Sequence, residues 1–524
     1  MGNKLSTSSE SISRIQESLL SHFTSDEREC LIGVFNRFCG IDSANNHNYN
    51  LNVVGKDDQT EKKEISLRDA QQHFSQIISN SLKYGFAKYF QYESIKIKQS
   101  TTTKLSSEKQ EDPITILGFL SSIQKLRRSP LSDEAQSIFI IYRACGGALR
   151  TFVRDVIDAS IIYWFEGAYD SSKINDVEFI SAAVLPNGDD GLLEFLLLMA
   201  NSSAHDPENP ETSAEILKTF EIDGYFTEPL FINWYMKNIH FQILIKILIE
   251  RLFLSAHQSA LLLTSKQITN LRKTNLLAPQ INSLFPTKSF SQLLSPDDYF
   301  LLVYNLPSNC RVTPHTMIFS STFDGDSWHT FVNSLLYQGS TIIVVKDTDG
   351  YVFGGFVYED WHMLPRFYGS NLNFLFTVRP KLRVYSGANG FNENWQYLNS
   401  GTQTLPNEML LGLGMGGQLD YFGFWIDSNF ITGHSRAAPL SSTYNSPRLS
   451  KQEEFKIDQV EVWLVKPTER DPDTIPHQQK YSAMDRNPAE MELLEMAANN
   501  NPTRKIGYSR FVREPDVRPT DDIE

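Results

Sequence analysis

The sequence predicts a multidomain protein with an all-α N-terminal half, an α+β domain around a central β-sandwich, and a C-terminal tail holding one short helix. Its 524 residues exceed what a single hydrophobic core takes up, since cores stop growing at about 250 to 300 residues. Apolar residues recur at helical spacing up to about residue 263 and at strand spacing from residue 289. These changes divide the chain into residues 1–24, 25–288, 289–467 and 468–524.

Residues 1–24 are predicted to be a flexible N-terminus with a lipidation pattern. The opening "MGNKLS" places Gly2 and Ser6 in the pattern M-G-x-x-x-[ST], which is typical of N-myristoylation after removal of Met1. A disordered polar start is the alternative. A single myristoyl chain binds a bilayer only weakly, and no polybasic segment lies nearby to reinforce it. If Gly2 is acylated, we therefore expect a second attachment to the same membrane.

Residues 25–288 are predicted to be helical. The segment "TSDERECLIGVFNRFCG" offers Thr24 or Ser25 as the N-cap, has acidic residues in its first turn, and ends at Gly40. Two later segments, "AQSIFIIYRACGGALRTFVRDVIDASIIYWF" and "EPLFINWYMKNIHFQILIKILIERLFL", repeat the apolar spacing of a helix. Charged residues interrupt the longest apolar stretch, so the pattern favours a buried amphipathic helix over a membrane span.

A helix followed by "CGIDSANNHNYN" raises the question of a calcium-binding EF-hand. Counting from Asp42, the sixth position is His47, where the loop requires glycine, and the twelfth is Val53, where it requires a bidentate glutamate. We therefore expect no calcium at this loop. A degenerate, metal-free EF-hand-like helix pair stays open.

Residues 289–467 change to the short, β-branched and aromatic runs that are typical of strands. The runs are "STIIVVKD", "YVFGGFVY", "LNFLFTV", "LRVYS", "YFGFWID" and "QVEVWLVKP". The turn "DTDG" lies between the first two and predicts a hairpin. Helices are expected around "SQLLSPDDYFLLVYNLP" and "DSWHTFVNSLLYQ", which makes this an α+β domain with a β-sandwich or strongly twisted sheets.

The tail, residues 468–524, holds six prolines and has eight basic against twelve acidic residues. Within it, "NPAEMELLEMAANN" predicts a short amphipathic helix whose apolar side is Met491, Leu494 and Met496. Such a helix on a flexible tether binds a partner or packs back on its own domain. Both alternatives stay open.

The segment "GLGMGGQLDYFGFWID" contains Gly412, Gly414 and Gly417 at the spacing G-x-G-x-x-G. A dinucleotide site requires a helix after this loop, and here a strand follows; a Walker loop requires a lysine, and none lies between Lys381 and Lys451. Phosphate binding is therefore disfavoured. We expect instead a tight connection between strands, packed beneath large aromatic rings.

The composition argues against several classes of function. A formal charge of −14 disfavours nucleic-acid binding, and four scattered cysteines fit neither a zinc site nor a disulfide framework. Nucleophile sets such as Ser435 with His434, or Cys310 with His315 and Asp324, lack a local signature. We predict no catalytic residue, no metal and no cofactor.

The pair Asp324 and Asp326 in "FDGDSWH" could suggest a metal site. A single D-x-D is a weak signal, and Asp326 precedes a predicted helix, so we interpret it as the cap of that helix.

Four segments together resemble the TLDc domain over roughly residues 290 to 467. They are "FDGDSWHTFVNSLL", "TIIVVKDTDGYVFGGFV", "GLGMGGQLDYFGFWID" and "GHSRAAPLSSTYNSPRLSKQEEFKIDQVEVWLV", in the order found in the family. The signature positions are Gly412, Gly414, Gly416, Gly417, Phe422, Gly423, Trp425, His434, Ser435 and Arg436. The initial Met-Gly and the helical N-terminal half further resemble the mTOR-associated, nematode eak-type subfamily.

The resemblance implies a non-catalytic adaptor. It implies binding to the vacuolar proton-pumping ATPase through the TLDc domain, a part in mTOR signalling, and a place on the cytoplasmic face of the lysosomal membrane, which a myristoyl group on Gly2 would support. It also implies a degenerate EF-hand-like N-terminal region. Other TLDc proteins are associated with resistance to oxidative stress, so a redox or protective role is the alternative. That role would require an exposed, low-pKa thiol, and the domain contains only Cys310.

Overall fold

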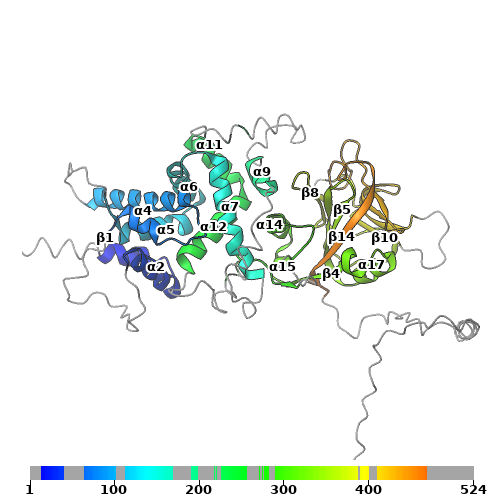
Figure 1. Cartoon of the computed structure of the whole chain (residues 1–524), viewed down its shortest axis with the longest axis horizontal. Helices are drawn as coiled ribbons and strands as arrows, with labels where there is room; N and C mark the ends of the chain where they lie inside the picture. The colour runs from blue at the N-terminus through cyan, green and yellow to red at the C-terminus, as the bar shows by residue number, and fades with distance from the viewer. Residues whose placement is uncertain are drawn as a thin grey trace, which may run out of the picture. The chain divides into compact units, whose positions relative to one another are not determined.

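The computed structural model describes residues 13–40, 64–101, 112–168, 190–198, 226–255, 276–282, 290–387, 390–399 and 410–468, with positions 218, 220, 271 and 274 (Figure 1). The chain divides into two compact units, Met1–Thr468 and Glu469–Glu524, and the described residues lie in the first. The predictions for Gly2, for the loop at Asp42, and for Met491, Leu494 and Met496 fall outside the described residues.

The N-terminal half is helical, as predicted. Its helices are α2 (Ser25–Phe38), α3 (Leu67–Gln72), α4 (Asn80–Thr101), α5 (Ile116–Arg128), α6 (Leu131–Ala144), α7 (Leu149–Phe165), α9 (Gly191–Leu198), α11 (Glu228–Lys237) and α12 (Ile239–Ile249), the last continued by the π-helical turn η4 (Glu250–Leu254). Short strands β1 (Glu64–Ile65) and β2 (Ile114–Thr115) pair antiparallel.

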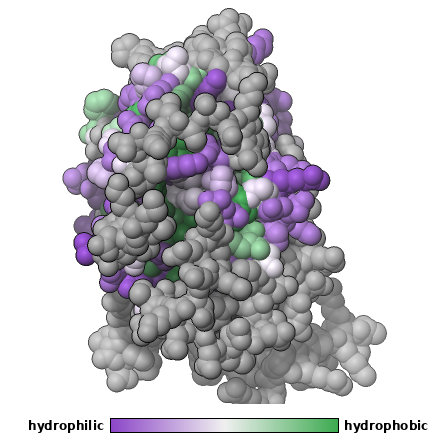
Figure 2. Space-filling view, turned by 90° about the vertical axis from the view of Figure 1, so that its left-hand side faces the viewer, coloured by the Kyte–Doolittle hydropathy of each residue, from purple (hydrophilic) through white to green (hydrophobic). Residues whose placement is uncertain are grey.

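Helix α12 carries the longest apolar stretch, and most of its side chains are buried, which confirms the prediction of a core helix. Within the described ranges, none of the helices combines the length and the apolar character that crossing a bilayer requires. Figure 2 turns the end of the molecule at the left of Figure 1 toward the viewer, and the described surface there is mainly hydrophilic with smaller hydrophobic areas.

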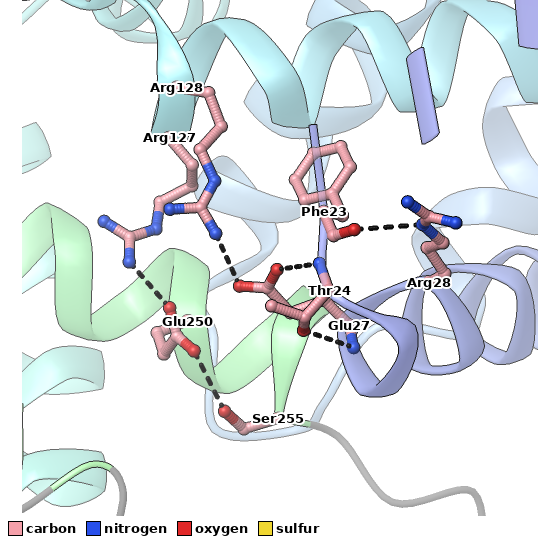
Figure 3. Close-up of polar contacts among 8 residues, drawn as sticks. All are labelled: Phe23, Thr24, Glu27, Arg28, Arg127, Arg128, Glu250 and Ser255. Atoms are coloured by element: carbon pink, nitrogen blue, oxygen red, sulfur yellow. Dashed lines mark hydrogen bonds and ion pairs between the residues drawn. The ribbon is translucent and has the colours of Figure 1, made fainter. Parts of the chain in front are cut away.

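Helix α2 begins with the expected cap (Figure 3). The backbone amide of Glu27 donates to the Thr24 hydroxyl at 3.3 Å, and the backbone amide of Thr24 donates to the Glu27 carboxylate at 2.8 Å, forming a capping box. The other carboxylate oxygen of Glu27 pairs with Arg128 of α5 at 2.7 Å. Next to it, Arg127 pairs with Glu250 of η4 at 2.8 Å. These contacts join α2, α5 and η4. Gly40 follows the helix at a φ of 70°, as a C-terminal glycine should.

The region from residue 276 is rich in strands, as predicted. They are β3 (Ile281–Asn282), β4 (His315–Ser320), β5 (Gly339–Asp347), β6 (Val352–Val357), β7 (Leu364–Tyr368), β8 (Phe374–Arg379), β9 (Arg383–Ser386), β10 (Gln396–Asn399), β11 (Gly412–Gln418), β12 (Tyr421–Asp427), β13 (Thr432–His434) and β14 (Glu454–Pro467). The helices are α14 (Pro296–Asn305), α15 (Ser308–Arg311), α16 (Ser321–Asp324) and α17 (Trp328–Leu335). Both predicted helices of this region are therefore present.

These described strands form one sheet in the order β7-β10-β11-β12-β13-β14-β5-β6-β8-β9, with β4 also beside β14 and β3 beside β4. Strands β5 and β6 pair antiparallel around the turn "DTDG", where Gly350 has a φ of 86°, so the predicted hairpin is confirmed. The 14-residue strand β14 pairs first with β13 and then with β5 and β4, and so connects the two parts of the sheet.

Helix α14 is buried between the N-terminal helices and the sheet. Its Phe300 ring lies 5.2 Å from the indole of Trp164 in α7, and its Tyr299 ring lies 6.4 Å from Trp463 in β14. One hydrophobic core therefore includes α7, α14 and one face of the sheet. A second core includes Phe331, Phe353 and Phe424 and so contains side chains of α17, β6 and β12.

Two sequence predictions require correction. The glycines of "GLGMGGQ" do not form a connection, because Gly412–Gln418 is itself the strand β11, and the turn follows at Leu419 and Asp420. The cap of α17 is Ser327 and not Asp326, since the Ser327 hydroxyl accepts the amide hydrogen of Thr330 at 3.4 Å.

Candidate functional site

The signature residues lie on three adjacent strands and at the two positions that follow the third strand. In the pairing of β11 with β12, Gly412 is opposite Asp427, Gly414 is opposite Trp425, and Gly417 is opposite Phe422. On the far side of β12, Trp425 is opposite His434 of β13. The sheet therefore brings residues of β11, β12 and β13 that are far apart in the sequence into one cluster.

The glycines of β11 leave room for aromatic rings. A β-carbon built on Gly414 would lie 2.5 Å from the ring of Phe422, and one on Gly412 would overlap the indole of Trp425. The Phe422 and Trp425 rings stack with their centroids 4.4 Å apart, and the His434 ring lies 5.8 Å from Trp425 and 6.1 Å from Phe422. Because these glycines have no side chains, the aromatic rings can pack directly on the strand backbone. The room beside the glycines is therefore occupied by the protein's own side chains and not by a phosphate group.

Gly416 and Gly417 have φ values of 72° and 85°, which favour glycine. A β-carbon on Gly416 would lie 2.7 Å from the ring of Tyr444. The amide of Gly417 donates to the Thr443 hydroxyl at 2.8 Å, and the Gly417 carbonyl accepts from the side chain of Asn394 at 2.7 Å. These two glycines therefore attach the end of β11 to the loops that precede β10 and β14.

Ser435 and His434 do not form a nucleophile and base. The Ser435 hydroxyl donates to the carbonyl of Gly423 at 2.7 Å and accepts from the amide of Leu449 at 2.9 Å, so both of its functions serve the fold. Burial, with a smaller contribution from Arg436, lowers the pKa of His434 to about 4. Its ring is therefore neutral at pH 7 and contributes mainly by packing.

Arg436 closes the signature cluster by contacts between strands and loops. Its guanidinium pairs with Glu453 at 2.8 Å and with Glu454 at 3.7 Å, and it also donates to the carbonyl of Asp420. The backbone amide of Arg436 donates to the carbonyl of Phe422 at 2.9 Å. Arg436 therefore joins the turn after β11 to the start of β14.

Cys310 and His315 are close, but their contact is not that of a thiol with a base. The His315 Nε2 hydrogen is donated to the backbone carbonyl of Cys310 at 2.7 Å, and Nδ1 accepts from the Tyr299 hydroxyl at 2.5 Å. Burial raises the pKa of the Cys310 thiol and lowers the pKa of His315 to about 4. The carboxylate of Asp324 accepts from the amide of Ser320 instead. This arrangement stabilises a neutral imidazole in the core.

The described part of the chain contains no group of three or more histidine, cysteine, aspartate or glutamate side chains placed to hold a metal ion. Asp324 and Asp326 therefore have no further ligands there. The signature residues on β11, β12 and β13 contribute by packing and by hydrogen bonds to the backbone.

Residues 287–466, which include the glycine strand, its aromatic rings and β14, match the TLDc domain. The chain carries a TLDc domain.

Among curated proteins, the chain with this TLDc domain is similar to the MTOR-associated protein MEAK7 of two vertebrates. It is 40% identical to the Gallus gallus protein over 229 residues, which are 42% of this chain and 46% of that protein. It is 43% identical to the Xenopus laevis protein over 228 residues, 44% of this chain and 47% of that protein. The chain thus matches about half the length of these relatives.

A more distant similarity joins the TLDc domain to proteins with other names. The chain is 29% identical to nuclear receptor coactivator 7 of Gallus gallus over 177 residues, 34% of this chain and 18% of that protein. It is 28% identical to oxidation resistance protein 1 of Rattus norvegicus over 174 residues, 33% of this chain and 19% of that protein.

Sequence reasoning missed the polar residues that hold the glycine strand of the TLDc domain in place. The side chain of Asn392 donates to the carbonyl of Gly417 at 3.1 Å and to the Ser442 hydroxyl at 2.9 Å, while its oxygen accepts from Thr443. Tyr444 donates to the carbonyl of Trp395 at 2.6 Å. The asparagines of "GFNENW" were the available signal, because Asn side chains often bind backbone groups in loops.

Proposed function

We propose that this chain is a non-catalytic adaptor of mTOR signalling that binds the vacuolar proton-pumping ATPase through its TLDc domain on the cytoplasmic face of the lysosomal membrane. The observation that carries the proposal is the TLDc domain together with 40% identity to a protein named MTOR-associated. Pump binding is what the resemblance to TLDc proteins implies. The lysosomal membrane is where the pump and the acylated Gly2 would both retain the chain.

The burial and hydrogen bonding of the candidate catalytic side chains support a binding role over catalysis. Ser435 and His315 are fully buried and bonded to backbone carbonyls, and the Cys310 thiol is buried with a raised pKa. A catalytic group must reach its substrate and hold a suitable pKa, and these three groups do neither in the described fold.

Two finer features of the fold belong to this proposal. Strands β1 and β2 join the helix–loop–helix segments α2–α3 and α4–α5, which supports an EF-hand-like pair without calcium. The second core supports a β-sandwich, because Phe353 of β6 packs edge to face on Phe424 of β12 at 6.1 Å. We expect calorimetry with calcium to detect no binding by the chain.

Binding to the purified pump tests the proposal directly. We expect the full chain to bind detergent-solubilised pump saturably, and to bind lysosomal membranes in larger amount than the Gly2→Ala variant does. Two weak attachments on one molecule raise the effective concentration, so loss of the acyl chain should lower the yield on membranes without abolishing binding to solubilised pump. Absence of binding to the purified pump by the wild type would contradict the proposal.

The mTOR arm requires a separate readout in cells. Removal of the chain should change phosphorylation of mTOR substrates, and expression of the wild type should restore it. The Gly2→Ala variant should restore it less well, because less of the chain stays on the membrane. Equal restoration by both proteins would show that the membrane attachment is not needed.

A redox role is the alternative, since one relative is named oxidation resistance protein 1. A peroxide assay with purified protein separates the two functions. An adaptor should give the same low peroxide consumption as its Cys310→Ser variant, whereas a thiol-based enzyme should lose its turnover in that variant.

A further inference from the structure

Three loops of the TLDc domain meet at one end of strands β11 and β12. The amide of Phe391 donates to the carbonyl of Ser442 at 2.6 Å, and Asn392 donates to both Ser442 and the carbonyl of Gly417. The amide of Gly416 donates to the carbonyl of Asn394 at 3.0 Å. The segments 390–394, 416–421 and 440–443 are therefore held side by side by their own hydrogen bonds.

Large apolar side chains are exposed on these joined loops. Phe391 is 88% exposed, Leu419 53%, Tyr421 41% and Leu440 45%. We call these four side chains the Phe391 face. The face is rigidly supported, since the Asn392 and Thr443 contacts beneath it are part of the domain fold. A rigid cluster of exposed apolar side chains is typical of an interaction surface, because exposure to water is unfavourable for each of them.

The charges around the Phe391 face are mainly negative. Glu393 lies two positions after Phe391, and Asp420 lies between Leu419 and Tyr421. Arg436 brings Glu453 and Glu454 to the same turn. The side chains of Glu453 and Glu454 are 57% and 81% exposed.

The nearby cations balance only part of this charge. Arg436 pairs with Glu453 and Glu454 and so offsets one of the four carboxylates, and Lys451 pairs with Asp349 at 3.5 Å. The Phe391 face therefore presents apolar side chains inside an acidic rim.

We propose that the Phe391 face docks a basic amphipathic segment of a subunit of the proton pump, an inference that rests on the proposed function. Apolar side chains of that segment would cover Phe391 and Leu419, and its lysines or arginines would lie against Asp420 and Glu454. Charge complementarity of this kind favours the correct partner and speeds association. A few buried aromatic side chains often contribute most of the binding energy of an interface, which makes Phe391 the expected anchor.

Two other candidate occupants belong to this chain. Residues 468–524 have eight basic against twelve acidic residues, and their predicted helix contains Glu490, Glu492 and Glu495, but the segment "RKIGYSRFVR" at 504–513 has four basic and no acidic residues and is the competing occupant that the experiment must exclude. A second copy of the chain would bring a formal charge of −14. Like charges on both sides of an interface are unfavourable, so a second copy matches the acidic rim less well than a basic segment does.

Substitutions in the full chain test the face against solubilised, purified pump. Phe391→Ser should weaken binding by about tenfold or more, as loss of an aromatic anchor does. Glu454→Lys should weaken binding by about threefold at low salt and less at high salt, because salt screens exposed charges. Ile431→Ser is the matched control, since Ile431 is 61% exposed at the opposite end of β12, and it should leave binding within about twofold of the wild type. All variants should retain the thermal stability of the wild type.

A photo-crosslinking residue at position 391 identifies the occupant. Cross-links to a lysine- or arginine-rich segment of a pump subunit support the proposal. Cross-links to residues 469–524 or to a second copy overturn it, as does pump binding that is unchanged in both Phe391→Ser and Glu454→Lys. If the wild type itself fails to bind the pump, the proposed function is wrong as well. If the wild type binds the pump and substitutions in the Phe391 face do not change this binding, only the inference about the face is wrong.

Discussion

At the scale of single residues, the glycines of β11 have two different reasons to be glycine. Gly412 and Gly414 give space to rings, whereas Gly417 also has a φ of 85° and a β-carbon site that overlaps the carbonyl of Tyr421. Gly350 shares the φ, at 86°, but has open space around its β-carbon site. A substitution at Gly350 therefore tests backbone strain alone, whereas the same substitution at Gly417 tests backbone strain together with steric overlap.

Gly417→Ala should cost the domain more stability than Gly350→Ala. The left-handed backbone alone costs about 1 to 2 kcal/mol, and overlap adds about 1 to 3 kcal/mol at Gly417. Urea unfolding of both variants beside the wild type measures the difference. Equal losses at the two positions would mean that the carbonyl of Tyr421 moves aside freely. A bulkier Gly417→Val variant should lose pump binding through the same damage.

The buried His315 gives the protein a defined response to acid. Burial lowers its folded pKa from the ordinary value of 6.5 to about 4. The unfolded chain therefore binds a proton first as the pH falls below 6.5, and the folded state loses up to about 1.4 kcal/mol per pH unit from this group until it too is protonated.

His315→Gln should reduce the slope of stability against pH between about 4 and 6.5. We expect the variant to be less stable than the wild type at pH 7, and the gap to narrow on acidification. Urea midpoints over this pH range measure it, with the exposed His73→Gln as the control. A gap that stays constant with pH would show that His315 does not titrate in this way.

Residue identities were enough to disfavour a phosphate loop but not to locate the polar side chains that hold β11 in place. The lack of a Walker-type lysine near the glycines and the strand-like pattern "YFGFWID" after them can both be recognised in the local sequence. Asn392 acts on Gly417 and Thr443, which lie 25 and 51 positions away, so its role depends on which loops the sheet brings together. No local pattern carries that information.

At the scale of elements, α2 is fixed at its first turn by one carboxylate with two tasks. Glu27 completes the capping box with Thr24 and pairs with Arg128 of α5 (Figure 3). The Glu27 side chain is 16% exposed and that of Arg128 is 36% exposed, so the pair is only partly screened by water.

Glu27→Gln should therefore loosen α2 locally. We expect a loss of about 1 kcal/mol, since Gln keeps one capping contact but not the ion pair. Hydrogen exchange at the α2 amides should quicken while exchange in β5 does not change. Glu29→Gln, on the exposed side of the same helix, is the control and should leave α2 exchange as in the wild type.

Helices and strands could be predicted from the spacing of apolar residues, except for β11, where glycines interrupt that spacing. Helix α12, helix α14 and the β5–β6 hairpin follow directly from apolar spacing and turn residues. Strand β11 has large apolar side chains only at Leu413 and Met415, which alternate with Gly412, Gly414 and Gly416. Glycine is depleted in strands, so the sequence favoured a loop there, and packing against Trp425 overrides that preference.

At the scale of the whole described molecule, the shared core makes the N-terminal helices and the TLDc domain interdependent. Phe300 of α14 packs on Trp164 of α7, although they are separated by the change from helical to strand periodicity. Removing the N-terminal half would expose this face of α14. Binding experiments on the TLDc domain therefore belong in the full chain.

Phe300→Ala should destabilise both parts together. We expect a loss of about 3 to 5 kcal/mol, with faster hydrogen exchange in α7 as well as in β14. Phe331→Ala is the matched control, because Phe331 lies in the second core and its loss should affect the sheet more than α7. Separate unfolding of the helices and the sheet, with α7 unaffected by Phe300→Ala, would contradict the shared core.

Strand β14 also determines how the described unit responds to mechanical load. It ends at Pro467, opposite Gly339, and the amide of Thr468 still donates to the carbonyl of Gln338 at 2.9 Å. The chain then continues directly into residues 469–524. A partner that pulls on that segment would load β14 along its length, in shear against antiparallel neighbours on both sides, so many ladder hydrogen bonds must break at once. The fold thus gives the C-terminal segment a force-resistant attachment point.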